Sequence, residues 1–187
     1  ALREAAEIFE ELGDHTGSAW SINQQGDIAR GQGDMGAARA LYQRALSAFR
    51  EAEDPWGSAR SLTDLAYIGC AQGDHLAAEA ACREALKIFA GLWHRRGIAR
   101  ALEGFACLAL AQGHAERALK LAAASTCLRQ SIGAPRQQTE QFKLDQTLLP
   151  AWKSLSDEEG KRAWAEGSAM SLEAAIQYSL GELGAAI

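Results

Sequence analysis

The chain has 187 residues, enough for one domain with a sizeable core, and 48% of them are hydrophobic and 23% charged. The formal net charge is −5, and Arg residues are interleaved with Glu and Asp instead of forming a basic stripe that would bind phosphate backbones. No apolar run approaches the length that spans a bilayer, and no signal peptide is recognisable. We therefore expect a cytoplasmic protein without direct nucleic-acid or membrane contact.

A period of 40 residues organises most of the chain. Gly17-Ser18-Ala19, Gly57-Ser58-Ala59 and Gly97-Ile98-Ala99 begin 40 residues apart. Apolar and small columns recur at the same shift: Ile22, Leu62 and Leu102; Ile28, Ile68 and Leu108; Gly26, Ala66 and Ala106; Ala38, Ala78 and Ala118. Abundant alanine, few β-branched residues and apolar steps of three and four predict an all-α fold in which each unit is a pair of helices.

The first predicted helix covers residues 1–12 and has no partner. It aligns with the second helix of the next unit, Ala5 with Ala45 and Phe9 with Phe49. We therefore interpret the chain as an excised fragment; a natural start on an unpaired helix is the alternative. The missing partner should leave an apolar face exposed near Leu2, Ala5 and Phe9, and such a patch favours a homodimer.

Three predicted helix pairs follow, at 16–31 and 35–51, 56–71 and 75–90, and 96–111 and 115–130. A glycine near the middle of each unit, Gly33 in the first and Gly73 in the second, can adopt the left-handed conformation that ends a helix. Asp34 and Asp74 follow these glycines and can cap the second helix. Because a single pair cannot bury its apolar face, we expect the pairs to stack.

These columns resemble the tetratricopeptide repeat over residues 1–133. In that family the first helix carries a large apolar residue and then a small one, and the second helix carries small, aromatic and small residues. The matching residues here are Ile22, Gly26, Ala38, Tyr42 and Ala45. The resemblance implies a right-handed superhelix of antiparallel helix pairs. The third unit has Ala122 in place of the aromatic residue, so we expect its second helix to pack more like a cap.

Residues 134–187 are predicted to add capping helices to the same domain. Residues 136–155 keep part of the first-helix pattern, with Phe142 and Leu148 in the columns of Leu102 and Leu108. Two further helices are predicted from the caps Ser156 and Ser171. Trp152 and Trp164 should close the end of the core; ligand stacking is their alternative role. Segments from Cys127 to Pro135 and from Ala163 to Ala175 are similar to the C-terminal end of large bacterial signalling ATPases, including LuxR-type regulators.

The tetratricopeptide resemblance implies that the first helices line a concave groove. The residues on that face are Trp20, Asn23, Asp27 and Arg30 in the first unit, Arg60, Thr63 and Tyr67 in the second, and Arg100 and Glu103 in the third. An ordinary solvated face is the alternative interpretation. Arg60 and Arg100 share one column, and guanidinium groups suit carboxylates and phosphates, so an extended peptide or acidic segment is the expected occupant. Charge reversal at both is expected to weaken binding without unfolding the domain.

Catalysis finds no support in the sequence, and we expect no enzyme, cofactor or metal. The segment GQGDMG lacks the lysine and the preceding strand of a phosphate loop. The four cysteines and four histidines show no metal-ligand spacing, so we interpret the cysteines as packing residues and the histidines as solvated turn residues.

Two functional hypotheses remain. The first is a protein-binding or regulatory scaffold, whose partner is a protein, a peptide or another module of the same bacterial signalling or transcription-regulating protein. The second is a small-ligand sensor that relays occupancy to an upstream ATPase. An open groove favours the first hypothesis, and a deep enclosed apolar pocket favours the second.

Overall fold

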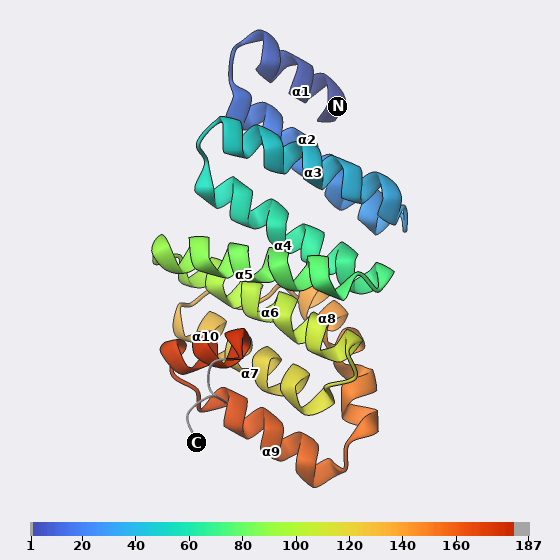
Figure 1. Cartoon of the computed structure of the whole chain (residues 1–187), viewed down its shortest axis with the longest axis vertical. Helices are drawn as coiled ribbons and strands as arrows, with labels where there is room; N and C mark the ends of the chain where they lie inside the picture. Colours follow the sequence, from blue (N-terminus) through green and yellow to red (C-terminus); the bar gives the residue numbers. More distant parts are fainter. Residues whose placement is uncertain (1, 182–187) are drawn as a thin grey trace.

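The computed structural model describes residues 2–181, without the side chains of residues 3 and 5–7. These residues form helices and no strand, which confirms the all-α prediction (Figure 1). The helices are α1 (Leu2–Glu11), α2 (His15–Gly31), α3 (Met35–Glu51), α4 (Pro55–Gln72), α5 (His75–Gly91), α6 (Arg95–Ala111), α7 (Ala115–Ser131), α8 (Gln138–Ser154), α9 (Asp157–Ser168) and α10 (Leu172–Leu180). The bounds predicted for α2 to α7 differ from these by one residue at most.

Helices α1 to α7 stack in chain order along the long axis of the molecule, as Figure 1 shows. The most extensive contacts lie within the predicted pairs α2–α3, α4–α5 and α6–α7, and α3–α4 and α5–α6 join one pair to the next. Helix α4 also contacts α2 and α6, so the first helices of the three units form one continuous wall. The arrangement is an α-solenoid of helix pairs; its right-handed sense stays a prediction.

The turns follow the capping chemistry predicted from the sequence. Gly33 and Gly73 have φ of 83° and 75°, and the carboxylates of Asp34 and Asp74 accept hydrogen bonds from the backbone N–H groups of Ala37 and Ala77. His114 occupies the same column one unit later, but its side chain caps nothing. The start of α7 therefore lacks a bond that α3 and α5 have.

We expect the substitution His114→Asp to raise the free energy of unfolding by about 1 kcal/mol, because it adds a cap and a negative charge at the positive end of the helix dipole. Urea unfolding followed by circular dichroism would measure the change. The substitution Asp74→Ala removes the cap of α5 and should lower the free energy of unfolding by about 1 kcal/mol. Equal unfolding midpoints for wild type and His114→Asp would contradict this explanation.

Aromatic rings of the second helices pack directly onto glycines of the following first helices. A Cβ atom at Gly57 would lie 2.5 Å from Cγ of Phe49, and one at Gly97 would lie 2.5 Å from Cγ of Phe89. Both rings are buried. Because these distances leave no room for a methyl group, the glycines set how closely successive units approach.

The N-terminal helix differs from the expectation in detail. Leu2 and Phe9 are half-buried, because Phe9 packs on Gly17 as Phe49 packs on Gly57, and the side chain of Ala5 lies outside the described residues. Among the described side chains of this end, the large apolar ones that are exposed are Ile8 and Leu12. A homodimer through this helix stays a prediction.

Ile28 is exposed, although its repeat partners Ile68 and Leu108 are buried. Ile68 packs in a cluster with Ala38, near the start of the 17-residue helix α3. The described part of the preceding helix, α1, has 10 residues and offers no counterpart of Ala38 to cover Ile28.

Helix α7 is an interior element, which corrects the expectation that it would pack like a cap. Helix α9 packs on it so closely that a Cβ atom at Gly167 would overlap the backbone of Lys120, and α8 and α10 add further contacts. The small side chains of Ala118 and Ala122 are fully buried. Helix α7 therefore packs against α6 and against all three C-terminal helices.

The predicted C-terminal helices form, with one difference. Ser156 and Ser171 cap α9 and α10 as expected, and the rings of Trp152 and Trp164 lie 5.8 Å apart. Leu148 is buried, but Phe142 is 64% exposed although its column predicts a core position. Helix α8 contacts α6, α7 and α9 instead of continuing the stack as a fourth first helix, so the column no longer faces the core.

Candidate functional site

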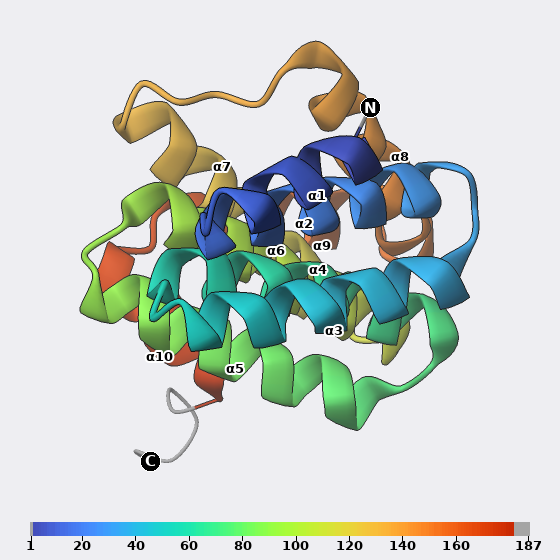
Figure 2. The same ribbon diagram turned by 90° about the horizontal axis from the view of Figure 1, so that it is seen from above.

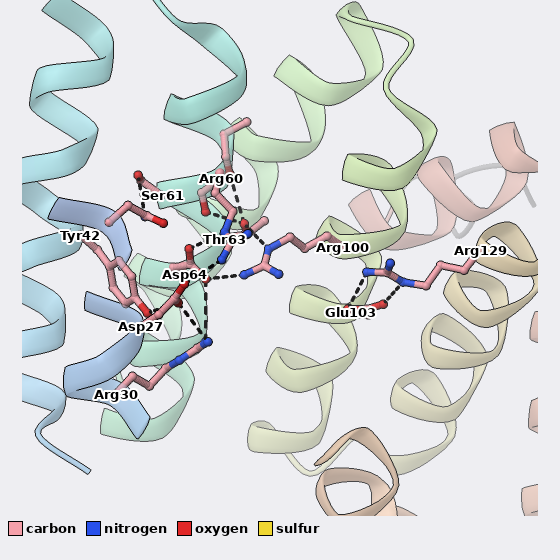
Figure 3. A network of polar contacts seen from close by, with 12 residues as sticks. Asp27, Arg30, Tyr42, Arg60, Ser61, Thr63, Asp64, Arg100, Glu103 and Arg129 are labelled. Atoms are coloured by element: carbon pink, nitrogen blue, oxygen red, sulfur yellow. Dashed lines mark hydrogen bonds and ion pairs between the residues drawn. The ribbon is translucent and has the colours of Figure 1, made fainter. Parts of the chain in front are cut away.

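Polar residues of α2, α4 and α6 meet around one buried carboxylate, Asp64 (Figure 3). Its oxygen atoms accept hydrogen bonds from Nε of Arg60 at 2.9 Å and from the guanidinium of Arg100, and Arg30 approaches to 3.8 Å. The side chain of Asp64 is fully buried, whereas those of the three arginines are 22–34% exposed. One carboxylate therefore binds three successive units together.

Asp27 extends this network at the surface of α2. It accepts hydrogen bonds from Arg60 at 3.0 Å, from Arg30 at 3.3 Å and from the hydroxyl of the buried Tyr42 at 2.8 Å. The side chain of Arg60 thus bridges Asp64 of its own helix, α4, and Asp27 of the neighbouring helix α2. Arg60 and Arg100 both form ion pairs within the fold, which the repeat pattern did not indicate.

Burial by itself raises the pKa of Asp64, but the charges of Arg100, Arg60 and Arg30 outweigh it and hold the pKa below its usual value. The pKa of Glu103 is lowered in the same way, by Arg129 and Arg136 against the effect of burial.

A carboxylate whose pKa is lower in the folded state stabilises the fold above its unfolded pKa, and this contribution disappears as the pH falls through the folded pKa. We therefore expect the free energy of unfolding to fall from about pH 5 downward, through the ordinary pKa of about 4. The decrease should be smaller in Asp64→Asn, which cannot titrate at this position. Urea unfolding at several pH values checks this; equal slopes for the two proteins would contradict it.

Two of the predicted groove residues are buried, which corrects their assignment to the groove surface. Asn23 is 1% exposed and donates to Ser61 at 3.2 Å, and Thr63 is fully buried and accepts a hydrogen bond from Nε of Arg100 at 3.1 Å. Both side chains lie between neighbouring first helices, so they hold the wall together and do not face a ligand.

Trp20 also lies away from the other predicted residues. Its ring is half-buried between Phe49 and Trp56, with ring centroids 4.7 and 4.6 Å apart. It lines neither of the two cavities next to Arg100. Of the residues expected on the groove face, Tyr67 and Arg100 share a cavity, and Arg60 and Arg100 share its neighbour.

A second polar cluster surrounds Glu103 and includes residues that the sequence pattern missed. Glu103 accepts hydrogen bonds from Arg129 of α7 at 2.7 Å and from Arg136, in the segment before α8, at 2.5 Å. Ser125 donates to the same carboxylate at 2.9 Å. Arg129 and Arg136 are almost completely buried, with side-chain exposures of 8% and 4%.

A cavity of about 500 Å³ lies between the first helices and α8, and we call it the groove. Five of the predicted residues line it: Asp27, Arg30, Tyr67, Arg100 and Glu103. Helix α8 supplies Glu140, Lys143, Leu144, Thr147 and Leu148 as the opposite wall. Figure 2 shows that the segment before α8 crosses from α7 to the side where α8 lies. The repeat pattern does not predict the opposite wall, because α8 follows the last of the three 40-residue units.

The described residues offer no cluster of side chains suited to a metal ion. No group of three His, Cys, Asp or Glu side chains among them could bind a metal. Cys82 is buried in the core, and burial raises the pKa of its thiol to about 12. None of the described helices is long and apolar enough to cross a membrane.

The fold and the groove define a class of protein, the α-solenoid built from tetratricopeptide-like helix pairs. Residues 1–51, which contain α1, α2 and α3, match the family model described as tetratricopeptide repeat. The comparison with curated proteins found no match. Tetratricopeptide repeats generally mediate protein–protein interaction, and this supports a scaffold role for the chain.

Proposed function

We propose that the chain is a protein-interaction module that binds a segment of a protein partner in the groove. The observation that carries this proposal is the pair of facing walls, the ladder of first helices on one side and α8 on the other. The cavity between them is open to solvent and lined by charged side chains together with Tyr67, Leu144 and Leu148. Such a mixture suits a peptide that offers both polar and apolar side chains.

We also propose that the chain is one part of a larger signalling protein. The C-terminal segments that resemble bacterial signalling ATPases support a place in a larger cytoplasmic signalling or transcription-regulating protein. Within such a protein, the bound segment would come from a partner or from another module of the same polypeptide. A scaffold of this kind binds the segment and holds it in position, and it needs no catalytic residue for that role.

A selection from a displayed random-peptide library against the whole chain tests the proposal. The variant Thr147→Trp places a large ring at an exposed position in the groove, and Ser47→Trp places the same ring at an exposed position on α3, outside the groove residues. We expect selected peptides to lose binding to Thr147→Trp and to keep it with Ser47→Trp. Peptides that bind both variants equally would exclude the groove as the site.

A small-ligand sensor is the second candidate, because a cavity of about 500 Å³ lies within the range of about 300–1,000 Å³ that small-molecule pockets occupy. The groove is open to solvent and has a charged lining, and both properties favour a peptide over a small enclosed ligand. If the peptide selection fails while a metabolite mixture raises the melting temperature of the wild type but not of Thr147→Trp, the sensor function is supported instead.

A further inference from the structure

The charges around the groove do not cancel. Arg30, Arg60 and Arg100 share the two carboxylates of Asp27 and Asp64. This cluster therefore carries one positive charge more than it has negative charges.

The same excess occurs at the other end of the groove. Arg129 and Arg136 share the single carboxylate of Glu103. On α8, Glu140 and Lys143 offset each other. The groove and the two clusters beside it thus contain six cations and four carboxylates, an excess of two positive charges in a chain whose net charge is −5. The cations are Arg30, Arg60, Arg100, Arg129, Arg136 and Lys143, and the carboxylates are Asp27, Asp64, Glu103 and Glu140.

Three donors in the groove retain hydrogen-bonding capacity. Lys143 forms no ion pair within the described part of the chain, and the hydroxyl of Tyr67 bonds to none of the described residues. Arg30 is 34% exposed and holds its carboxylates only at 3.3 and 3.8 Å. These donors come from α8, α4 and α2, so they reach the same cavity from both walls.

The guanidinium groups of Arg30 and Arg100 both lie near the ring of Tyr67. The Cζ atoms of Arg30 and Arg100 lie 5.9 and 6.0 Å from the centre of its ring. Leu144 and Leu148 supply apolar surface to the same cavity. A suitable ligand therefore combines a strongly anionic group with a carbon framework.

We propose that the groove binds a dianionic phosphomonoester, presented either by a phosphorylated side chain of a peptide or by a small organic phosphate. A phosphomonoester carries about −1.5 to −2 charges at pH 7 and three strong acceptor oxygens, which matches the excess of two positive charges and the three available donors. A single carboxylate would neutralise only half of that excess. The inference rests on the proposed function, because it takes the groove to be the binding surface.

Calorimetric titration of the whole chain with phenyl phosphate and phenyl sulfate tests the charge requirement. The two probes share their ring and their tetrahedral oxygens, but the sulfate keeps a single charge. We expect phenyl phosphate to bind roughly tenfold more tightly or better, and its advantage to shrink below about pH 6 as the dianion is protonated. Equal affinities at pH 7.5, or an advantage that does not change with pH, would overturn the proposal.

Matched variants locate the site. Lys143→Gln should weaken phenyl phosphate binding roughly tenfold, since it removes one charge-assisted hydrogen bond. Glu140→Gln should tighten binding, because glutamine keeps the capping role and loses the negative charge. Lys161→Gln is the control, because Lys161 is 75% exposed on α9 and lies outside the groove. If Lys143→Gln and Lys161→Gln bind phenyl phosphate with the same affinity, the groove is not the phosphate site.

A phosphoserine peptide library and its serine counterpart distinguish the two sources. Phosphopeptides that bind far more tightly than phenyl phosphate identify a phosphorylated segment, and equal affinities identify a free organic phosphate; both support the proposal. Serine peptides that bind wild type but not Thr147→Trp, with no gain from phosphorylation, would overturn the phosphate inference and leave the peptide-binding function standing. Failure of every probe and peptide to bind the groove would contradict both.

Discussion

Replacing Asp64 by alanine is expected to lower the free energy of unfolding by about 3–5 kcal/mol, because it removes the shared partner of a buried ion network. Arg30, Arg60 and Arg100 would then face one another with only Asp27 beside them. Guanidinium denaturation followed by circular dichroism measures the loss. The effect is large because Asp64 is fully buried and joins helices of three units.

Asp157→Ala is the control for this substitution. Asp157 pairs with Lys161 at 3.1 Å, but its side chain is 94% exposed, so its removal should change stability by less than about 1 kcal/mol. If Asp64→Ala lowers the free energy of unfolding no more than Asp157→Ala does, the ion network around Asp64 does not hold the units together.

The same network corrects an expectation about Arg60 and Arg100. Their charge reversal was expected to leave the fold intact, as it would at exposed sites. The structure pairs both with the buried Asp64, so Arg60→Glu and Arg100→Glu would place like charges together and destabilise the domain. Lys143, which has no such partner among the described residues, is the suitable position for testing binding.

Gly57→Ala and Gly97→Ala are each expected to destabilise the chain by about 1–3 kcal/mol through overpacking. In an open helix the same change would stabilise by up to about 1 kcal/mol, so the sign itself is informative. The added methyl group would overlap the buried ring of Phe49 or Phe89. Thermal and urea unfolding of the single variants measure the effect.

Gly91→Ala is the matched control, because a Cβ atom there meets nothing within 4 Å. It lies at the end of α5 and should leave stability unchanged or raise it slightly. If all three alanine variants behave alike, close approach of the aromatic rings does not set the spacing of the units.

The periodic part of the fold was predictable because each unit repeats the same packing and capping positions. Columns such as Ala38 and Ala78 must be small wherever two helices approach closely, and the glycines and aspartates of the turns follow known capping rules. Repetition therefore located α2 to α7 almost to the residue. The repeat pattern predicts burial for Ile28, but this side chain is exposed, because the described part of the neighbouring helix α1 is shorter than α3 and α5.

The polar site was less predictable because repetition does not show which polar residue is buried. Asp64 shares its column with Gln24 and Gly104, so no repeated signal marks it. Its spacing of four residues from Arg60 is the one local sign, typical of a helical ion pair. Arg136 and Lys143 lie beyond the periodic region, and only the folding of α8 against the first helices brings them to the groove.

We propose the groove between the first helices and α8 as the binding surface. Chemical-shift mapping of the labelled chain, titrated with a library-selected peptide, would locate the bound peptide. We expect the largest shifts at groove residues from both walls, such as Tyr67, Cys107, Leu144 and Thr147. Shifts concentrated on exposed residues of α3 and α5, with Tyr67 and Leu144 unchanged, would contradict it.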